Sequence, residues 1–148
     1  MSVYVDYVIL KVSYDESLNR LRELLDRKEE AFTRTLPSAI RYGLQRVRHS
    51  PSIISPLDEY VADVERIDQQ IREARIIAIE RRELLDLKEE ELRKSNDTND
   101  RIFVLRYLEC WKVERVARKL FYSVDTIWYR ERKIKDAVAK EGLSSFFK

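Results

Sequence analysis

Residues 60–92 read YVADVERIDQQIREARIIAIERRELLDLKEEEL. Steps of four and three residues from Tyr60 reach an apolar side chain at eight of ten positions, which places those side chains along one face of an α-helix. Just before this stretch, Pro56 suits the first turn of a helix, and Asp58 and Glu59 suit the positive end of its dipole. The sequence therefore predicts a long helix with one continuous apolar seam. The apolar seam comprises Tyr60, Val64, Ile67, Ile71, Ala74, Ala78, Leu85 and Leu92.

A second predicted helix lies upstream of the apolar seam. Leucines recur at helical spacing over residues 18–25, and Ser13 with Glu16 has the spacing of a capping box. We expect a helix from about Tyr14 to Thr33. It pairs with the helix over residues 60–92 in a long antiparallel coiled helical hairpin. Isoleucines at 76–79 make the apolar stripe wider than a two-stranded pair requires. A second copy of the chain is therefore an alternative partner, and the seam residues are then the contacts of a homodimer.

Two other stretches of the N-terminal half follow different patterns. VYVDYVILKV (3–12) is rich in β-branched and aromatic residues, which suit a short strand as well as an apolar turn of helix. The stretch from about residue 34 to residue 56 contains all three prolines, several cations and no carboxylate. Because prolines interrupt helices, we expect a flexible basic loop here, with His49 exposed to solvent.

The composition narrows the class of protein. Two glycines are too few for the turns of an all-β fold, so we expect an all-α protein. One histidine and one cysteine cannot form a His/Cys zinc site, and we expect Cys110 to be a small buried side chain. A glycine-rich phosphate loop and a histidine-centred acid–base pair are both missing from the sequence, which predicts no enzyme and no cofactor. Without an apolar run of 18 residues or a basic leader, we expect a cytoplasmic protein with no membrane span.

Charge is distributed unevenly along the chain. Residues 57–98 hold 8 basic and 13 acidic residues, a net charge of −5, whereas residues 99–148 hold 12 basic and 7 acidic residues, a net charge of +5. The polar run SNDTND (95–100) lies between these parts and offers several helix N-cap residues. We therefore expect a helical hairpin and dimerisation region over 1–98 and a separate domain over 99–148. The positive charge of the second domain is typical of nucleic-acid binding.

Residues 99–148 predict three short helices with apolar residues along one side of each. These helices span about 100–109, 113–120 and 123–140. Ser123 is a good N-cap for the third helix, and only residues 121–122 separate it from the second. Ala117, near the centre of the second helix, is small enough for the third helix to cross closely. This arrangement predicts a C-terminal helix-turn-helix, whose last helix enters the major groove of double-stranded DNA.

The predicted DNA-binding residues fall into two groups. Cations on or just before the second helix are expected to contact phosphates, and exposed polar side chains of the third helix are expected to reach base edges. The phosphate group is Lys112, Arg115, Arg118 and Lys119. The base-reading group is Asp125, Thr126, Tyr129, Arg130 and Lys133, and Ser123 and Arg132 complete the predicted interface.

The same residues carry a family resemblance. Matches fall at Leu105, Tyr107, Leu108, Glu109, Glu114, Val116, Ala117, Leu120, Tyr122, Ser123, Thr126 and Ile127. The run FVLRYLECWKVERVARKLFYSVDTIWYR (103–130) thereby resembles the C-terminal part of the ArpU/RinA-type phage late-transcription regulators, which in turn resemble region 4 of bacterial sigma factors. The acidic helices and the proline-bearing loop are similar to that family too. The resemblance implies a phage or prophage protein that acts on late genes in the cytoplasm of a bacterial host and contacts host RNA polymerase.

Four positions depart from the family pattern. Cys110 and Phe121 each replace a glycine, and Lys112 stands where a hydroxyl cap is common. Arg130 lies where the family has an apolar core residue, so its side chain need not face outward. Phe121 lies in the turn between the second and third helices. A non-glycine residue tolerates a left-handed backbone poorly, so the geometry of that turn is in question.

We expect a sequence-specific DNA-binding transcriptional regulator, either an activator or a repressor. One alternative is an interaction protein whose basic face binds an acidic protein. Another is a small DNA-packaging protein, similar to a terminase small subunit, that assembles into rings without a transcriptional role.

Overall fold

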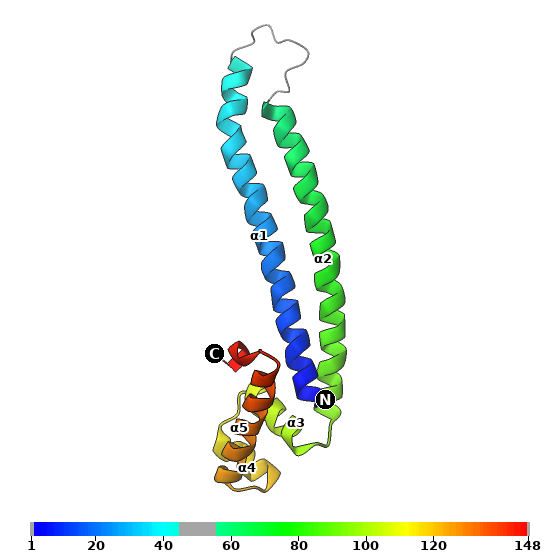
Figure 1. The fold of residues 1–148 in the computed structure, drawn as a ribbon, viewed down its shortest axis with the longest axis vertical. Coiled ribbons are helices and arrows are strands. Elements are labelled where there is room, and N and C mark those ends of the chain that lie inside the picture. The colour runs from blue at the N-terminus through cyan, green and yellow to red at the C-terminus, as the bar shows by residue number, and fades with distance from the viewer. Residues whose placement is uncertain (1, 45–55, 148) are drawn as a thin grey trace. The chain divides into compact units, whose positions relative to one another are not determined.

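A computed structural model describes residues 2–44 and 56–147, and within them every regular element is a helix (Figure 1). The all-α prediction is thus confirmed. The elements are α1 (Val3–Leu44), α2 (Pro56–Lys94), α3 (Thr98–Phe103), the π-helix η1 (Val104–Leu108), α4 (Val113–Leu120), α5 (Val124–Lys140) and the 3-10 helix η2 (Ser144–Phe147).

Helix α1 is longer at both ends than the sequence pattern predicts. It begins at Val3, so residues 3–12 form helix rather than strand, and the expected cap at Ser13 is wrong. The Ser13 carbonyl instead accepts a hydrogen bond of 2.7 Å from Arg81. The loop expected from about residue 34 is also wrong in its first part, because the helix continues through Pro37 to Leu44. The rest of that predicted loop, residues 45–55 with His49, lies outside the described residues.

In α1 the packing of the apolar face outweighs the local preference of proline and of β-branched residues against a helix. Proline removes one backbone donor, whereas the stability of a helix in a protein comes mainly from the packing of its apolar face. The described part of that face is well packed. Val8 is fully buried and Leu24 almost fully buried. Tertiary packing therefore explains why the helix continues where local propensities predicted breaks.

The chain divides into two compact units that do not coincide with the polar break at 98/99. Unit 1 joins residues 1–15 to residues 80–148, and unit 2 comprises residues 16–79. The first turns of α1 and the last turns of α2 thus belong with the C-terminal helices. Both units contain a segment of α1 antiparallel to a segment of α2, as the predicted hairpin requires (Figure 1).

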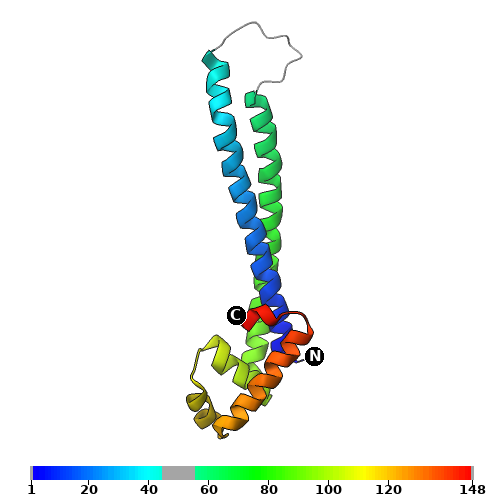
Figure 2. The same ribbon diagram turned by 60° about the vertical axis from the view of Figure 1, so that its left-hand side comes forward.

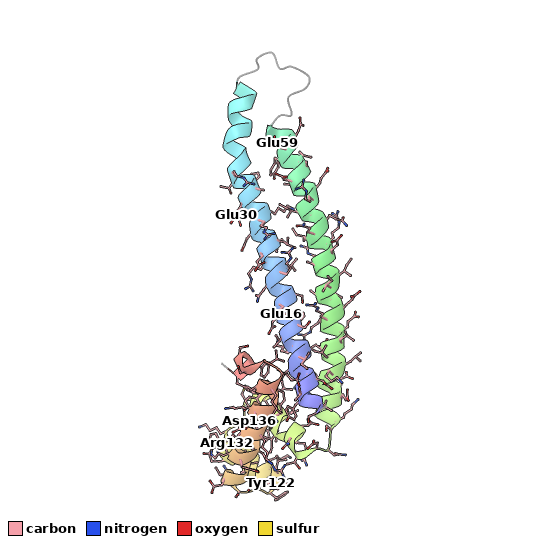
Figure 3. All side chains as sticks on the ribbon, viewed as in Figure 1. Glu16, Glu30, Glu59, Tyr122, Arg132 and Asp136 are labelled. Carbon is pink, nitrogen blue, oxygen red and sulfur yellow. The ribbon has the colours of Figure 1, made fainter. Side chains whose placement is uncertain are left out.

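In unit 2 the two helices pack through a small apolar cluster. Leu24 of α1 is buried against Ile71 and Ala74 of α2. An ion pair of 2.7 Å joins Lys28 to Asp68 across the same two helices, and the rings of Phe32 and Tyr60 lie edge to face with their centroids 6.0 Å apart. Acidic side chains that include Glu16, Glu30 and Glu59 lie on the solvent side of this hairpin (Figure 3).

The core of unit 1 draws on every helix of that unit. The ring of Phe103 in α3 lies 5.2–6.0 Å from the rings of Tyr4, Tyr7, Tyr107 and Phe146, measured between centroids. Around this aromatic group the fully buried residues are Val8, Leu92, Ile102, Val116, Ile127, Ile134 and Val138. The path from α3 through η1 to α4 and α5 can be followed in Figure 2.

The apolar seam of α2 is covered from inside the chain. Its residues Ile71, Ala74, Ala78 and Leu85 are buried, while Tyr60, Val64 and Ile67 are half-buried. Ile71 and Ala74 belong to the cluster of unit 2, and Leu85 belongs to the core of unit 1. Because α1 already covers these side chains, a homodimer that forms with the hairpin intact needs another surface. Among the described helices, none combines the length and the apolar character of a membrane span.

Neighbouring leucines test the packing of unit 2. Leu24 is 1% exposed and Leu25 is 42% exposed. We expect Leu24→Ala to lower the free energy of unfolding by about 2–4 kcal/mol, because it opens a cavity between the two helices. Leu25→Ala removes the same atoms from a solvated site and is expected to cost less than about 0.5 kcal/mol. Urea denaturation followed by circular dichroism at the helix band measures both changes, and equal losses would contradict this account of the hairpin.

Candidate nucleic-acid interface

The candidate interface is built on α4, α5 and the turn between them. Val116 and Ala117 of α4 are buried in the core that also holds Ile127 of α5. The Tyr122 amide donates a 3.0 Å hydrogen bond to the Ala117 carbonyl, and this bond closes the end of α4. Ser123 then caps α5, because its hydroxyl accepts a 3.2 Å hydrogen bond from the Thr126 amide. The predicted limits of both helices and the predicted cap are confirmed.

Phe121 makes the turn with a left-handed backbone. Its φ is +60° and its ψ is +39°, the conformation that the sequence placed in question. Its side chain is 94% exposed, so packing does not compensate for the backbone strain. The surrounding helices fix this conformation, since α4 and α5 are both anchored in the core of unit 1.

Cys110 is the second non-glycine residue with a positive φ, at +56°. The expectation of a buried side chain is wrong, because Cys110 is exposed. It follows η1, where the chain reverses so that the Trp111 amide can donate a 2.8 Å hydrogen bond to the Leu105 carbonyl. This reversal leaves the Cys110 side chain exposed to solvent and outside the core of unit 1.

A buried ionic network fixes the rotation of α5. Glu131 is only 2% exposed, and its Oε1 is paired with Arg106 of η1. The Tyr107 hydroxyl donates a 3.3 Å hydrogen bond to the same oxygen, and Arg106 also donates one of 2.7 Å to the Trp111 carbonyl. Burial, followed by the nearby carboxylate, raises the pKa of Tyr107 well above its ordinary value. Among the described residues, Oε2 of Glu131 has no hydrogen-bond partner.

Sequence reasoning did not identify Glu131, although its position gave a signal. It follows Ile127 by four residues and precedes Ile134 by three, which places it on the inner side of α5. A carboxylate at an inward helical position needs a partner, because an isolated buried charge is costly. Arg106 of η1 is that partner.

The rotation set by Glu131 defines the outer face of α5. The outer face consists of five exposed residues: Asp125, Trp128, Tyr129, Arg132 and Lys133. Trp128 was not among the predicted residues, yet 50% of its surface is exposed at the centre of this face. Its spacing of three from Asp125 and four from Arg132 was the available signal. Figure 3 shows Arg132 with Asp136 one turn further along α5.

Two predicted base-reading residues lie elsewhere. Thr126 is half-buried, and its hydroxyl lies 2.8 Å from that of Ser123, so it belongs to the helix cap. Arg130 is also half-buried, and it donates a 3.2 Å hydrogen bond to the side chain of Asn99. Its guanidinium lies 5.5 Å from the centre of the Tyr122 ring. Both residues therefore stabilise the domain, and neither belongs to the outer face of α5.

The predicted phosphate-contacting residues Lys112, Arg115, Arg118 and Lys119 are all exposed. Arg115 lies over the ring of Trp111, with its guanidinium carbon 3.8 Å from the ring centre. On α5, Lys133 lies 4.6 Å from the centre of the Tyr129 ring, and its hydrogen bond lowers the pKa of the Tyr129 hydroxyl. Aromatic rings thus lie against two of the cations on this surface and favour these positions.

The Arg106–Glu131 pair can be tested with a double-mutant cycle. We expect Arg106→Met to cost about 3–5 kcal/mol of unfolding free energy, because it leaves the Glu131 charge buried without its partner. Adding Glu131→Leu should restore much of that loss. Arg93→Met, which breaks exposed pairs with Glu89 and Glu109, is the control and should cost less than about 1 kcal/mol. Additive losses in the double variant, measured by urea denaturation, would show that the two side chains are not coupled.

Tyr107 predicts a pH dependence of stability. Burial raises the pKa of its hydroxyl, so the folded state holds the phenol proton more tightly than the unfolded state does. This contribution to stability is fully present below the ordinary tyrosine pKa of about 10 and is lost as the pH rises above it. We expect Tyr107→Phe to make the loss of stability between neutral and strongly alkaline pH less steep. An unchanged slope in denaturant titrations across that range would contradict this role.

The described residues contain no cluster of three or more His, Cys, Asp or Glu side chains that could hold a metal ion. The arrangement offers cations, exposed aromatic rings and, on the outer face of α5, the carboxylate of Asp125, which are groups suited to binding. Comparison of the chain with known protein families, with curated proteins and with solved structures gives no match.

Proposed function

We propose that the protein is a sequence-specific DNA-binding regulator of transcription and not an enzyme. In this proposal α4 and α5 form a helix-turn-helix, and α5 is the recognition helix in the major groove of double-stranded DNA. The observation that carries the proposal is the outer face of α5. Its side chains are able to read bases, and the opposite side of the helix is anchored in the core of unit 1. Ile127, Glu131 and Ile134 are buried on the opposite side of the helix.

The outer face of α5 supplies three kinds of contact to base edges. Arg132 and Lys133 suit the acceptors of guanine, and Asp125 suits the amino group of cytosine. The rings of Trp128 and Tyr129 suit the methyl group of thymine. These five side chains replace the set predicted from the sequence, since Thr126 and Arg130 act within the domain.

Phosphate contacts complete the proposed interface. Lys112, Arg115 and Arg118 are exposed on or just before α4, and none of them forms an ion pair with a described residue. Such contacts orient a protein on DNA without reading its sequence. Residues 99–148 have a net charge of +5, which raises the rate of encounter with a polyanion.

The wider role rests on the family resemblance of residues 103–130. It supports a phage or prophage regulator of late genes that works in the bacterial cytoplasm as a homodimer, because two half-sites multiply the modest affinity of one small domain. The acidic hairpin is proposed as the part that dimerises or contacts host RNA polymerase.

Binding to duplex DNA selected from a randomised library tests the proposal. We expect Trp128→Ala and Arg132→Ala to weaken binding to the selected sequence by about 5- to 150-fold and to leave nonspecific binding nearly unchanged. Arg115→Ala should instead weaken both kinds of binding and make the logarithmic salt dependence shallower by about 0.9. Arg72→Ala, on the hairpin of unit 2, is the matched control and should have no effect.

Fluorescence anisotropy over a range of salt concentrations measures all of these quantities. Failure to enrich any duplex from the library would overturn the proposal. So would an affinity that does not depend on salt. A ring of many copies in a solution mass measurement would favour the packaging alternative over a dimeric regulator.

A further inference from the structure

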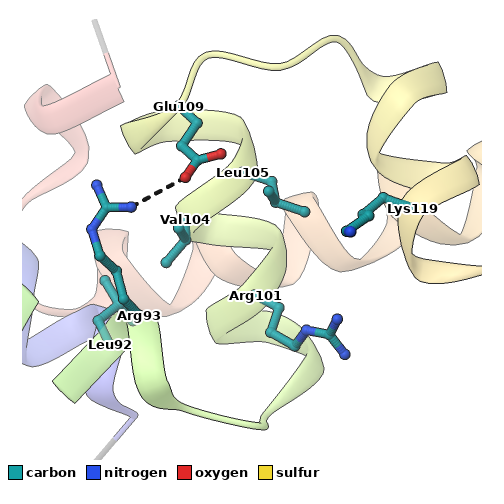
Figure 4. A pocket seen from close by; sticks show the side chains of 7 residues that line it. All are labelled: Leu92, Arg93, Arg101, Val104, Leu105, Glu109 and Lys119. Atoms are coloured by element: carbon teal, nitrogen blue, oxygen red, sulfur yellow. Dashed lines mark hydrogen bonds and ion pairs between the residues drawn. The ribbon is translucent and has the colours of Figure 1, made fainter. Parts of the chain in front are cut away.

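A pocket of about 210 Å³ lies in unit 1 among α2, α3, η1 and α4 (Figure 4). Three apolar side chains and four charged ones form its wall. The apolar residues are Leu92, Val104 and Leu105, and the charged residues are Arg93, Arg101, Glu109 and Lys119. We call this site the Leu105 pocket. None of the five residues on the outer face of α5 lines it.

The described residues balance only part of the positive charge of the Leu105 pocket. Arg93 donates hydrogen bonds of 3.0 and 3.1 Å to Glu89 and forms an ion pair of 3.1 Å with Glu109. Arg101 and Lys119 form no ion pair with any residue that the structure describes. Figure 4 shows the Arg93–Glu109 pair on one side of the pocket and these two free cations on the other.

The apolar part of the pocket is rigid. Leu92 and Val104 are buried in the core of unit 1, and Leu105 packs against that core. Val104 and Leu105 belong to η1, and single π-helical turns of this kind are frequent at functional sites. The pocket thus offers a fixed apolar floor beside two uncommitted cations.

This combination suits a peptide better than DNA or a small molecule. A phosphate gains nothing from an apolar floor, and the volume is below the range of about 300–1,000 Å³ that is usual for small-molecule sites. One large apolar side chain of a docked segment fills such a space, and neighbouring carboxylates of the same segment match the two cations. Opposite charges across a contact of this kind favour encounter and orientation.

We propose that the Leu105 pocket receives an acidic amphipathic segment of a partner protein. An apolar side chain of the segment lies on Leu105, and its carboxylates pair with Arg101 and Lys119. Lys119 is thereby assigned to protein binding rather than to a DNA phosphate. The inference is independent of the proposed function, because the pocket needs no DNA in order to bind the segment.

The test uses a short fluorescein-labelled peptide of Asp, Glu and Leu in a helical amphipathic pattern, titrated with the full chain in the absence of DNA. We expect saturable binding that Arg101→Gln with Lys119→Gln weakens at least about tenfold. Leu105→Gln should weaken it as well. Lys140→Gln removes an exposed cation of α5 outside the pocket and is the matched control. Circular dichroism verifies that each variant keeps its helical content.

Two control peptides separate the pocket from general charge attraction. Replacing every Leu of the peptide by Ser, or every acidic residue by Lys, should abolish binding. Equal binding of the Ser peptide would overturn the inference, since charge alone would then explain it. Equal weakening by Lys140→Gln would overturn it for the same reason.

DNA binding provides the last comparison. The double Gln variant should keep the salt dependence of the wild type on the selected duplex, because neither cation neutralises a phosphate in this proposal. A shallower dependence would assign Arg101 and Lys119 to the DNA interface and overturn the inference. Peptide binding by a chain that fails to bind DNA would instead support the pocket and refute the proposed function.

Discussion

The carboxylate of Asp100 joins three separate stretches of unit 1. Its Oδ1 accepts a 3.2 Å hydrogen bond from the Tyr4 amide at the start of α1, and its Oδ2 accepts one of 2.6 Å from Ser95 after α2. The residue itself lies in the first turn of α3, where a negative charge suits the helix dipole. Burial raises the pKa of this carboxyl, so the two hydrogen bonds offset a real cost of desolvation. Without this junction the start of α1 would lose its polar anchor beside the aromatic group around Phe103.

The elements that follow Asp100 position the proposed DNA-binding surface, and η1 is the connecting segment. Phe103 ends α3 against Tyr4 and Tyr7, and the π-helical turn that follows places Arg106 opposite Glu131. Glu131 in turn sets which side of α5 faces solvent. The groups that would read DNA are therefore positioned by buried groups that never touch it. In the same turn, the neighbouring Leu105 lines the pocket assigned to a partner protein.

The periodic parts of this fold could be predicted from the sequence, and the parts fixed by distant contacts could not. The spacing of the apolar seam is a local property, so it identified the hairpin, and Ser123 marked the start of α5 for the same reason. The apolar residues of 3–12 suit a strand as well as a helix, so their local pattern does not decide between the two. Their helical state depends on burial of Tyr4 and Val8 among residues nearly a hundred positions away. The candidate site shows the same difference between local and distant contacts. Trp128, and not Arg130, lies on the outer face of α5, because the contact of Glu131 with Arg106 sets which side of α5 points inward.

The long reach of the Tyr4–Asp100 bond also determines the order in which the protein can form during synthesis. The start of α1 leaves the ribosome before α2 to α5 do, yet the side chains that cover Tyr4 and Val8 belong largely to α2, α3 and the helices after α3. Contacts of such high sequence separation form slowly, because a long loop must close before they stabilise anything. The hairpin of unit 2, by contrast, needs only residues 16–79. A growing chain therefore carries an uncovered apolar segment at the start of α1 until α5 emerges, and a chain released before that point would expose this segment to aggregation.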